Sequence, residues 1–98
     1  MEIWKICEGL YEISNLGNLR RGGAIIKPRL DRYGYLIATL WINGKCHTRK
    51  IHRLVALAFI ENPSNRTQVN HTGKDVSGKI DKKDNRVVSI EWSTSLEN

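Results

Sequence analysis

The dipeptide Asn43-Gly44 most constrains what this chain can fold into. It separates two β-like runs, residues 35–42 and 45–50, and Asn-Gly readily adopts the two positive φ angles of a type I′ turn. We therefore predict a hairpin with a two-residue loop. Its register pairs Ile42 with Lys45, Leu40 with His47 and Ala38 with Arg49. Alternation places these basic residues on the same face as apolar ones, so the sequence leaves open whether that face meets the core or a polyanion.

The hydrophobic pattern changes from β-like to helical at residue 51. Residues 3–50 form short β-like runs separated by glycines, whereas residues 51–60 are apolar nearly all round and end before Asn62-Pro63. This pattern predicts a buried helix that packs on the sheet with one side and on the C-terminal segment with the other. We also expect strands at 67–71 and 87–92, a polar loop at 72–83 and at most one helical turn after Ser95. The predicted fold class is α+β in one compact unit.

Basic residues are concentrated in the first part of the chain. Residues 1–60 hold ten bases and four acids, and residues 61–98 hold six of each. A cationic stretch of this kind indicates a polyanionic partner, double-stranded DNA, with a solvated basic face as the alternative. Residues 20–53 hold nine bases and one acid, Asp31. These nine bases are the candidate DNA-binding residues: Arg20, Arg21, Lys27, Arg29, Arg32, Lys45, Arg49, Lys50 and Arg53.

The apolar runs and the cysteines exclude several classes of protein. No apolar run approaches the roughly 20 residues of a membrane span, and residues 1–20 lack the order of a signal peptide. Cys7 and Cys46 stand alone, which argues against a disulfide framework or a cysteine-rich zinc site. We therefore expect a cytoplasmic protein that does not contact the membrane.

Several conspicuous side chains are interpreted as structural. His52 opens the expected helix, where packing is favoured over metal binding. The polar loop at 72–83 is expected to be solvated, because three of its lysines are balanced by three nearby aspartates: Lys79, Lys82 and Lys83 by Asp75, Asp81 and Asp84. The tryptophans, expected to be core anchors rather than base-stacking platforms, are Trp4, Trp41 and Trp92.

Asn70-His71 is the candidate for chemistry, at the end of an expected strand and ahead of a polar loop. Hydrolysis of a phosphodiester needs a base that takes a proton from water and a cation that neutralises the phosphate. His71 and a divalent ion meet these needs, and Mg²⁺ prefers oxygen ligands and retains several waters. We expect His71 to lie at the mouth of a cationic groove. From spacing alone, a structural histidine remains the alternative.

Segments along nearly the whole chain resemble one protein family. They are WK at 4–5, GLYEISNLGNLR at 9–20, HRLVALAFI at 52–60, NP at 62–63, VNH at 69–71, NR at 85–86, EW at 91–92 and EN at 97–98. The first two resemble the NUMOD4-type module of phage and intron HNH homing endonucleases. The others resemble the HNH nuclease region of the same family.

The resemblance implies a β-rich DNA-binding module at 1–50 and a small, shortened ββα-metal HNH module at 51–98. It implies that His71 is the general base and that Asn70 and Asn98 bind the metal, Mg²⁺ or Mn²⁺. Ser89 falls at the central position, where the family has an asparagine that orients the base. The implied function is a small metal-dependent DNA endonuclease of phage or mobile-element origin, acting in a bacterial host cell. A short chain of this kind is expected to nick with modest sequence selectivity.

The serine at the central position and the short C-terminal end motivate a second hypothesis. The site has decayed, and the chain binds DNA or a nucleic-acid-handling protein as a phage regulator or inhibitor. A fold does not guarantee the chemistry of its relatives, so function must be argued from the site.

Overall fold

The computed structural model describes residues 1–94, so Asn98 and the turn expected after Ser95 lie outside the described residues. The elements in chain order are β1 (Trp4–Glu8), β2 (Tyr11–Ser14), β3 (Leu19–Arg21), β4 (Ala24–Ile26), β5 (Arg29–Leu30), β6 (Leu36–Ile42), β7 (Lys45–Lys50), α1 (Ile51–Phe59), β8 (Gln68–His71), the 3-10 turn η1 (Val87–Ser89) and β9 (Ile90–Ser93). The predicted α+β class is confirmed.

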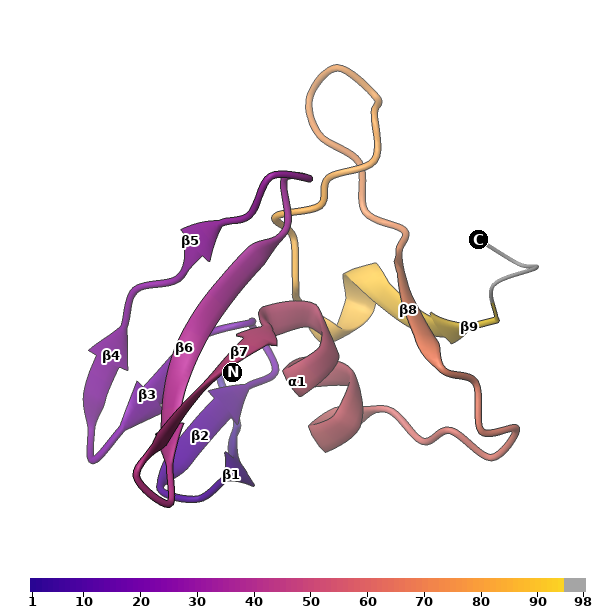
Figure 1. Ribbon diagram of the computed structural model, residues 1–98. Helices are drawn as coiled ribbons and strands as arrows, with labels where there is room; N and C mark the ends of the chain where they lie inside the picture. Colours follow the sequence, from indigo (N-terminus) through magenta and orange to yellow (C-terminus); the bar gives the residue numbers. More distant parts are fainter. Residues whose placement is uncertain (95–98) are drawn as a thin grey trace.

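The strands form three antiparallel sheets around α1. β1–β4 make a four-stranded sheet in sequential order, β5–β7 make a three-stranded sheet, and β8 pairs with β9. Figure 1 shows α1 between the N-terminal strands on one side and the β8–β9 pair on the other. β8 and β9 lie within residues 51–98, where the ββα-metal motif is expected, and the last four of these residues lie outside the described part of the chain. No helix in residues 1–94 is long and apolar enough to cross a membrane.

The predicted hairpin is present with the predicted register. Ile42 pairs with Lys45 and the pairing continues to Ile37 and Lys50, while Asn43 and Gly44 have φ angles of 53° and 77°. Burial settles the question of the faces. Ala38 and Leu40 are in the core, so the side that carries Lys45, His47 and Arg49 is the inner one.

The three tryptophans differ in their burial. Trp41 lies on the outer face of the hairpin and is 57% exposed, so its predicted role as a core anchor is wrong. The reason is alternation: its neighbour Leu40 occupies the inner face. Trp92 packs against the core and its indole donates to the carbonyl of Ile60 at 3.0 Å. Trp4 is half-buried beneath the guanidinium of Arg20, 4.0 Å from its ring centroid.

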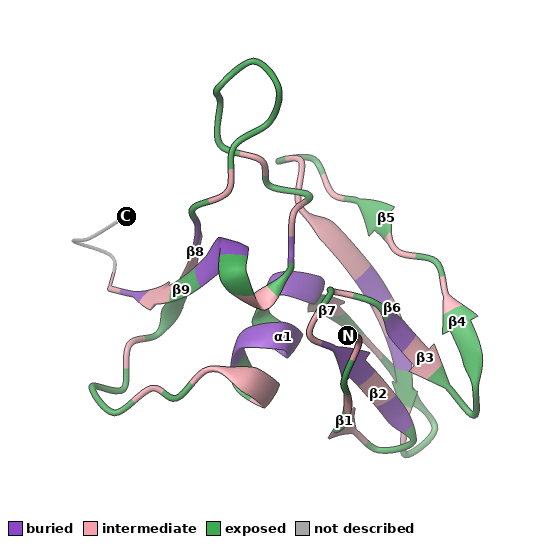
Figure 2. Ribbon diagram, turned by 180° about the vertical axis from the view of Figure 1, so that it is seen from behind, coloured by how far each residue is buried: buried purple, intermediate pink, exposed green. Residues whose placement is uncertain are grey.

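The central helix α1 begins and ends as predicted but is not buried all round. Ile51, Leu54 and Val55 are in the core, where full burial of each aliphatic side chain contributes about 1.5–3 kcal/mol. Leu57, on the opposite side, is 63% exposed. The helix contacts β1, β2, β6 and β7 as well as β8, η1 and β9, so it connects the N-terminal strands with the C-terminal segment. In Figure 2 much of its ribbon is coloured as buried.

The C-terminal segment differs from the prediction in one place. The β-like run expected at 87–92 begins as the 3-10 turn η1, and only β9 is a strand. Tertiary hydrogen bonding explains the difference, because Val87 N–H donates to the carbonyl of Asn15. This contact fastens the segment before β9 to the loop between β2 and β3.

Candidate functional site around His71

His71 is the last residue of β8 and is held from several sides. Its Nε2 lies 2.8 Å from Oδ1 of Asn85, and its ring centroid lies 4.7 Å from that of His52 and 5.7 Å from that of Tyr35. Only 4% of the residue is exposed. The rings of His52 in α1 and of Tyr35, just before β6, cover most of the imidazole, so little of it is exposed where it lines a surface hollow.

His52, in the first turn of α1, packs between Tyr35 and His71. It is 6% exposed, and burial lowers its pKa to about 3, with smaller contributions from the charges of His71 and Lys50. Within residues 1–94, its Nδ1 is buried without a hydrogen-bond partner. His52 is thus a neutral packing residue at physiological pH, as the sequence predicted.

Asn85 is the site residue that sequence reasoning did not assign to His71. It lies in the segment before η1, and Gly17 with its φ of +86° packs directly against it. A Cβ on Gly17 would lie 3.1 Å from Cβ of Asn85. The only available signal was its place in the NR segment of the family resemblance. The loop between β2 and β3 therefore helps to position Asn85.

Ser89 does not make the contact with His71 that its position implied. Its hydroxyl donates to Oδ2 of Asp84 at 2.7 Å, and Arg86 donates twice to the same carboxylate at 2.8 and 2.9 Å. The hydrogen bonds from Arg86, together with that from Ser89, hold the pKa of Asp84 well below its usual range. The short serine side chain is thus engaged by Asp84, while Asn85 contacts the imidazole.

Asn70 lies next to His71 and offers an oxygen to a cation. Its Nδ2 donates to Oε1 of Glu91 on β9 at 3.3 Å, which leaves its Oδ1 free of that bond. Amide and carboxylate oxygens are the ligands that Mg²⁺ prefers, so Oδ1 of Asn70 suits a hard divalent ion. Asn98, the other predicted ligand, lies outside the described residues, and residues 1–94 contain no cluster of three His, Cys, Asp or Glu that would hold a metal without it.

Two adjoining hollows connect His71 to the basic surface. The first lies beside His71 and is lined by Tyr35, Val69, Asn70, His71, Ile80 and Lys82. The second runs between β7, α1 and β8 and is lined by Tyr35, Thr48, Arg49, Lys50, His52, Arg53, Thr67, Gln68 and Val69. Tyr35 and Val69 line both hollows, which therefore adjoin. We call the two hollows together the basic groove.

The nine candidate DNA-binding residues fall into two groups. Arg20 and Arg49 are half-buried and paired with Glu12 and Glu8 at 2.9 and 2.8 Å, so part of their charge is neutralised within the protein. The exposed members are Arg21, Lys27, Arg29, Arg32, Lys45, Lys50 and Arg53. Of these, Lys50 and Arg53 line the basic groove.

The chain is similar to several known proteins. Residues 2–41 match the NUMOD4 motif. Two proteins of Acanthamoeba polyphaga mimivirus, each described as an uncharacterized HNH endonuclease, are 35% and 39% identical over 81% and 99% of this chain, which is 22% and 25% of their lengths. The DNA endonuclease I-HmuI of Bacillus phage SP01 is 32% identical over 89% of this chain and 48% of its own length.

The fold agrees with these relationships. The solved structure of the HNH homing endonuclease I-HmuI, an enzyme that binds and cleaves DNA, matches with a TM-score of 0.82 at 31% identity. The match covers 98% of this chain and 55% of that one. The chain thus spans between about a quarter and half of the length of these relatives.

Proposed function

Because the chain carries a NUMOD4 motif and is related to the HNH endonucleases, we propose that it binds duplex DNA and hydrolyses a phosphodiester bond in one strand. The proposal assigns DNA binding chiefly to residues 1–50 and catalysis to residues 51–98. The observation that carries it is the placement of His71, which Asn85 holds beside Asn70 at the edge of the basic groove.

His71 is the general base of this proposal. With Oδ1 of Asn85 accepting the Nε2 proton, the lone pair of the ring is on Nδ1. That nitrogen takes a proton from water, the water oxygen forms a bond to phosphorus, and the bond from phosphorus to the leaving sugar oxygen breaks. General-base catalysis of this kind contributes about 10²–10⁴-fold.

Asn70 is the residue proposed to hold a divalent ion, Mg²⁺ or Mn²⁺, through its Oδ1. When bound, such an ion supplies positive charge to the phosphate and the leaving oxygen. Glu91 fixes the amide through its hydrogen bond at 3.3 Å, which orients Oδ1 without using it. Asn98 stays a predicted second ligand.

The basic groove is proposed to receive the DNA backbone. Lys50 and Arg53 are exposed along it, and contacts with phosphates position a protein on duplex DNA without reading its sequence. Modest sequence selectivity stays our prediction.

Nicking of supercoiled plasmid in Mg²⁺ or Mn²⁺ tests the proposal. We expect conversion to the open circular form by the wild-type chain and a loss of about 10²–10⁴-fold in His71→Ala. His47→Gln is the matched control, because His47 lies on β7 on the inner face of the hairpin, outside the residues that line the basic groove. Absence of nicking by the wild-type chain in both metals would remove the claim of hydrolysis.

The engagement of Ser89 by Asp84 supports a second candidate, a chain that binds DNA without cleaving it. Here binding to duplex DNA persists in EDTA and in His71→Ala. A gel-shift titration in EDTA, run beside the nicking assay, separates the two. If DNA does not bind at low salt, a protein partner that handles nucleic acid is the remaining prediction.

A further inference from the structure

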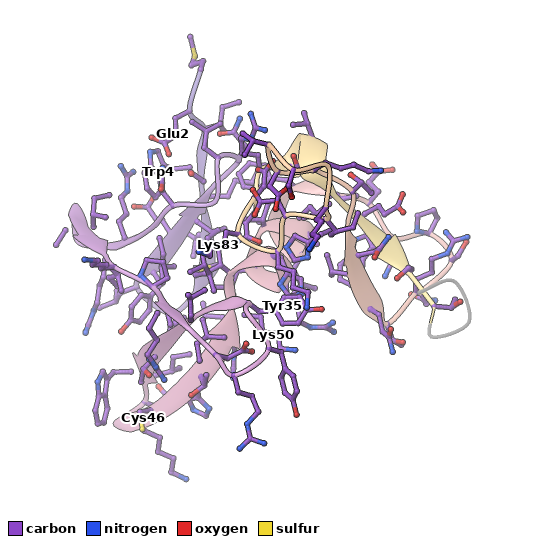
Figure 3. The ribbon with its side chains drawn as sticks, turned by 90° about the horizontal axis from the view of Figure 1, so that it is seen from above. Glu2, Trp4, Tyr35, Cys46, Lys50 and Lys83 are labelled. Carbon is purple, nitrogen blue, oxygen red and sulfur yellow. The ribbon has the colours of Figure 1, made fainter. Side chains whose placement is uncertain are left out.

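Two lysines from distant parts of the chain lie against one aromatic ring beside His71. The ammonium groups of Lys50 and Lys82 are each 5.0 Å from the ring centroid of Tyr35. They are therefore no more than about 10 Å apart, on the order of one Debye length at 0.1 M salt. Figure 3 shows Tyr35 and Lys50 side by side, away from Cys46 at the end of the hairpin.

Lys82 is fixed on this ring, although the sequence predicted that its loop is only solvated. Its Nζ donates to the carbonyl of Tyr33 at 3.1 Å, and its Cδ would lie 3.8 Å from a Cβ on Gly34. The loop at 72–83 is otherwise largely exposed (Figure 2). An ordered lysine at its base, docked on the turn before β6, needs an explanation beyond solubility.

The protein offsets only part of the positive charge around Tyr35. Within residues 1–94, neither ammonium group is in a direct ion pair with a carboxylate. Asp31 lies in the adjacent turn, where its Oδ1 accepts the backbone N–H groups of Tyr33 and Tyr35 at 2.8 and 3.0 Å, and its charge interacts with that of Lys50. One carboxylate beside two ammonium groups leaves an excess of positive charge, and an anion between the lysines relieves their repulsion.

The start of α1 adds to the positive potential at the same place. Lys50 is the N-cap residue of α1, no side chain among residues 1–94 caps the helix, and the first turn contains Arg53 and no acid. A helix N-terminus carries partial positive charge and favours anions over cations. Lys50 and Arg53 at this helix N-terminus destabilise the protein when no anion is bound. Such a concentration of positive charge is expected where an anion binds.

From these contacts we propose that Lys50 and Lys82, held on the ring of Tyr35, bind the phosphate on which His71 acts. Lys82 and His71 line the same hollow, and Lys50 lines the adjoining part of the basic groove. The two ammonium groups donate to the non-bridging oxygens and stabilise the negative charge that develops there. The inference rests on the proposed function and adds a residue of the 72–83 loop to the site.

The test compares Lys82 with its neighbour in the sequence. Lys82→Met removes the charge and keeps most of the side chain that covers Tyr35, Lys82→Arg keeps the charge, and Lys83→Met is a control with the same change in net charge. Lys83 is exposed and lines a different hollow with Asn85. Thermal unfolding of each variant confirms that it folds.

Two measurements are made on these variants. The first is the single-turnover nicking rate at saturating protein, which we expect to fall about 10²-fold in Lys82→Met, by the usual effect of removing a preorganised donor. Lys82→Arg should retain most of the rate and Lys83→Met all of it. The second is the dependence of DNA affinity on salt in EDTA, where the slope of log K against log salt should decrease by about 0.9 in Lys82→Met alone.

The outcomes separate this inference from the proposed function. If the wild-type chain nicks DNA and Lys82→Met matches Lys83→Met in both measurements, the phosphate site is wrong and hydrolysis stands. If no chain nicks DNA but only Lys82→Met changes the salt slope, hydrolysis is wrong and phosphate binding stands. A changed slope with an unchanged nicking rate would place the bound phosphate away from His71 and overturn the proposal.

Discussion

The hydrogen bond between Asn85 and His71 holds the proposed general base, and Asn85→Ala removes it. In Asn85→Ala, Nε2 of a buried imidazole loses an acceptor at 2.8 Å. An unsatisfied buried donor costs about 1–3 kcal/mol, against a total of roughly 5–15 kcal/mol for a domain. Since 1 kcal/mol lowers Tm by about 4–8 °C in a domain of 60–100 residues, we expect a decrease of between about 4 and about 24 °C.

Activity should decrease more steeply than stability. If the ring of His71 is free to turn, the nicking rate should fall about 10²-fold, because a small misplacement of a reacting group has an effect of that order. Thermal unfolding by circular dichroism and plasmid nicking below the Tm of the variant measure the two effects separately. Asn85→Asp keeps an oxygen acceptor at the same position and should recover part of the nicking rate.

Asn18→Ala is the matched control for Asn85→Ala. Asn18 is exposed, and its Nδ2 donates to Oε2 of Glu2 at 2.6 Å, a surface contact whose loss should change stability by no more than about 0.5 kcal/mol. If Asn85→Ala has the Tm and the nicking rate of Asn18→Ala, the bond to His71 does not position the base and the reasoning is refuted.

Two further predictions concern the surroundings of this bond. Because the pKa of His52 is about 3 in the folded chain and near 6.5 in the unfolded chain, only the unfolded chain binds the extra proton between these two pH values. The free energy of unfolding should therefore fall with decreasing pH, by up to about 1.4 kcal/mol per pH unit. Urea unfolding at pH 7 to 4 should show a weaker dependence of this free energy on pH for His52→Phe than for the wild-type chain, and an equal dependence would contradict the prediction. Gly17→Ala and Gly23→Ala both place a Cβ at positive φ, +86° and +83°, at a cost of about 1–2 kcal/mol each. Only Gly17→Ala displaces Asn85 and should also slow plasmid nicking, so an equal nicking rate in the two variants would argue against this coupling.

Local rules account for the parts of the fold that were predicted correctly. Asn43-Gly44 determined the turn and hence the register of β6 and β7, because turn geometry fixes strand pairing. The apolar run at 51–60 predicted α1 within a residue at its end. Neither result depends on contacts with distant parts of the chain.

Contacts between distant segments account for the parts that were not predicted. The sequence predicted that Ser89 contacts His71. Which residue lies at hydrogen-bond distance depends on how the backbone folds, and the fold brings Asn85 to the imidazole and Asp84 to Ser89. Trp41 was placed in the core by its residue type, although the pairing of β6 puts it outside. The docking of Lys82 on Tyr35 joins residues 47 positions apart in a way that no local pattern indicates.

The chain's own sequence thus determined its turns, its helix, its excess of positive charge and the Asn70-His71 pair, since propensity, periodicity and charge are properties of neighbouring residues. Tertiary structure alone decided that His71 is enclosed by Tyr35, His52 and Asn85. The physical reason is range: hydrogen bonds and ring contacts act over a few ångströms, and only the packed fold brings residues 35, 52, 71 and 85 within that distance.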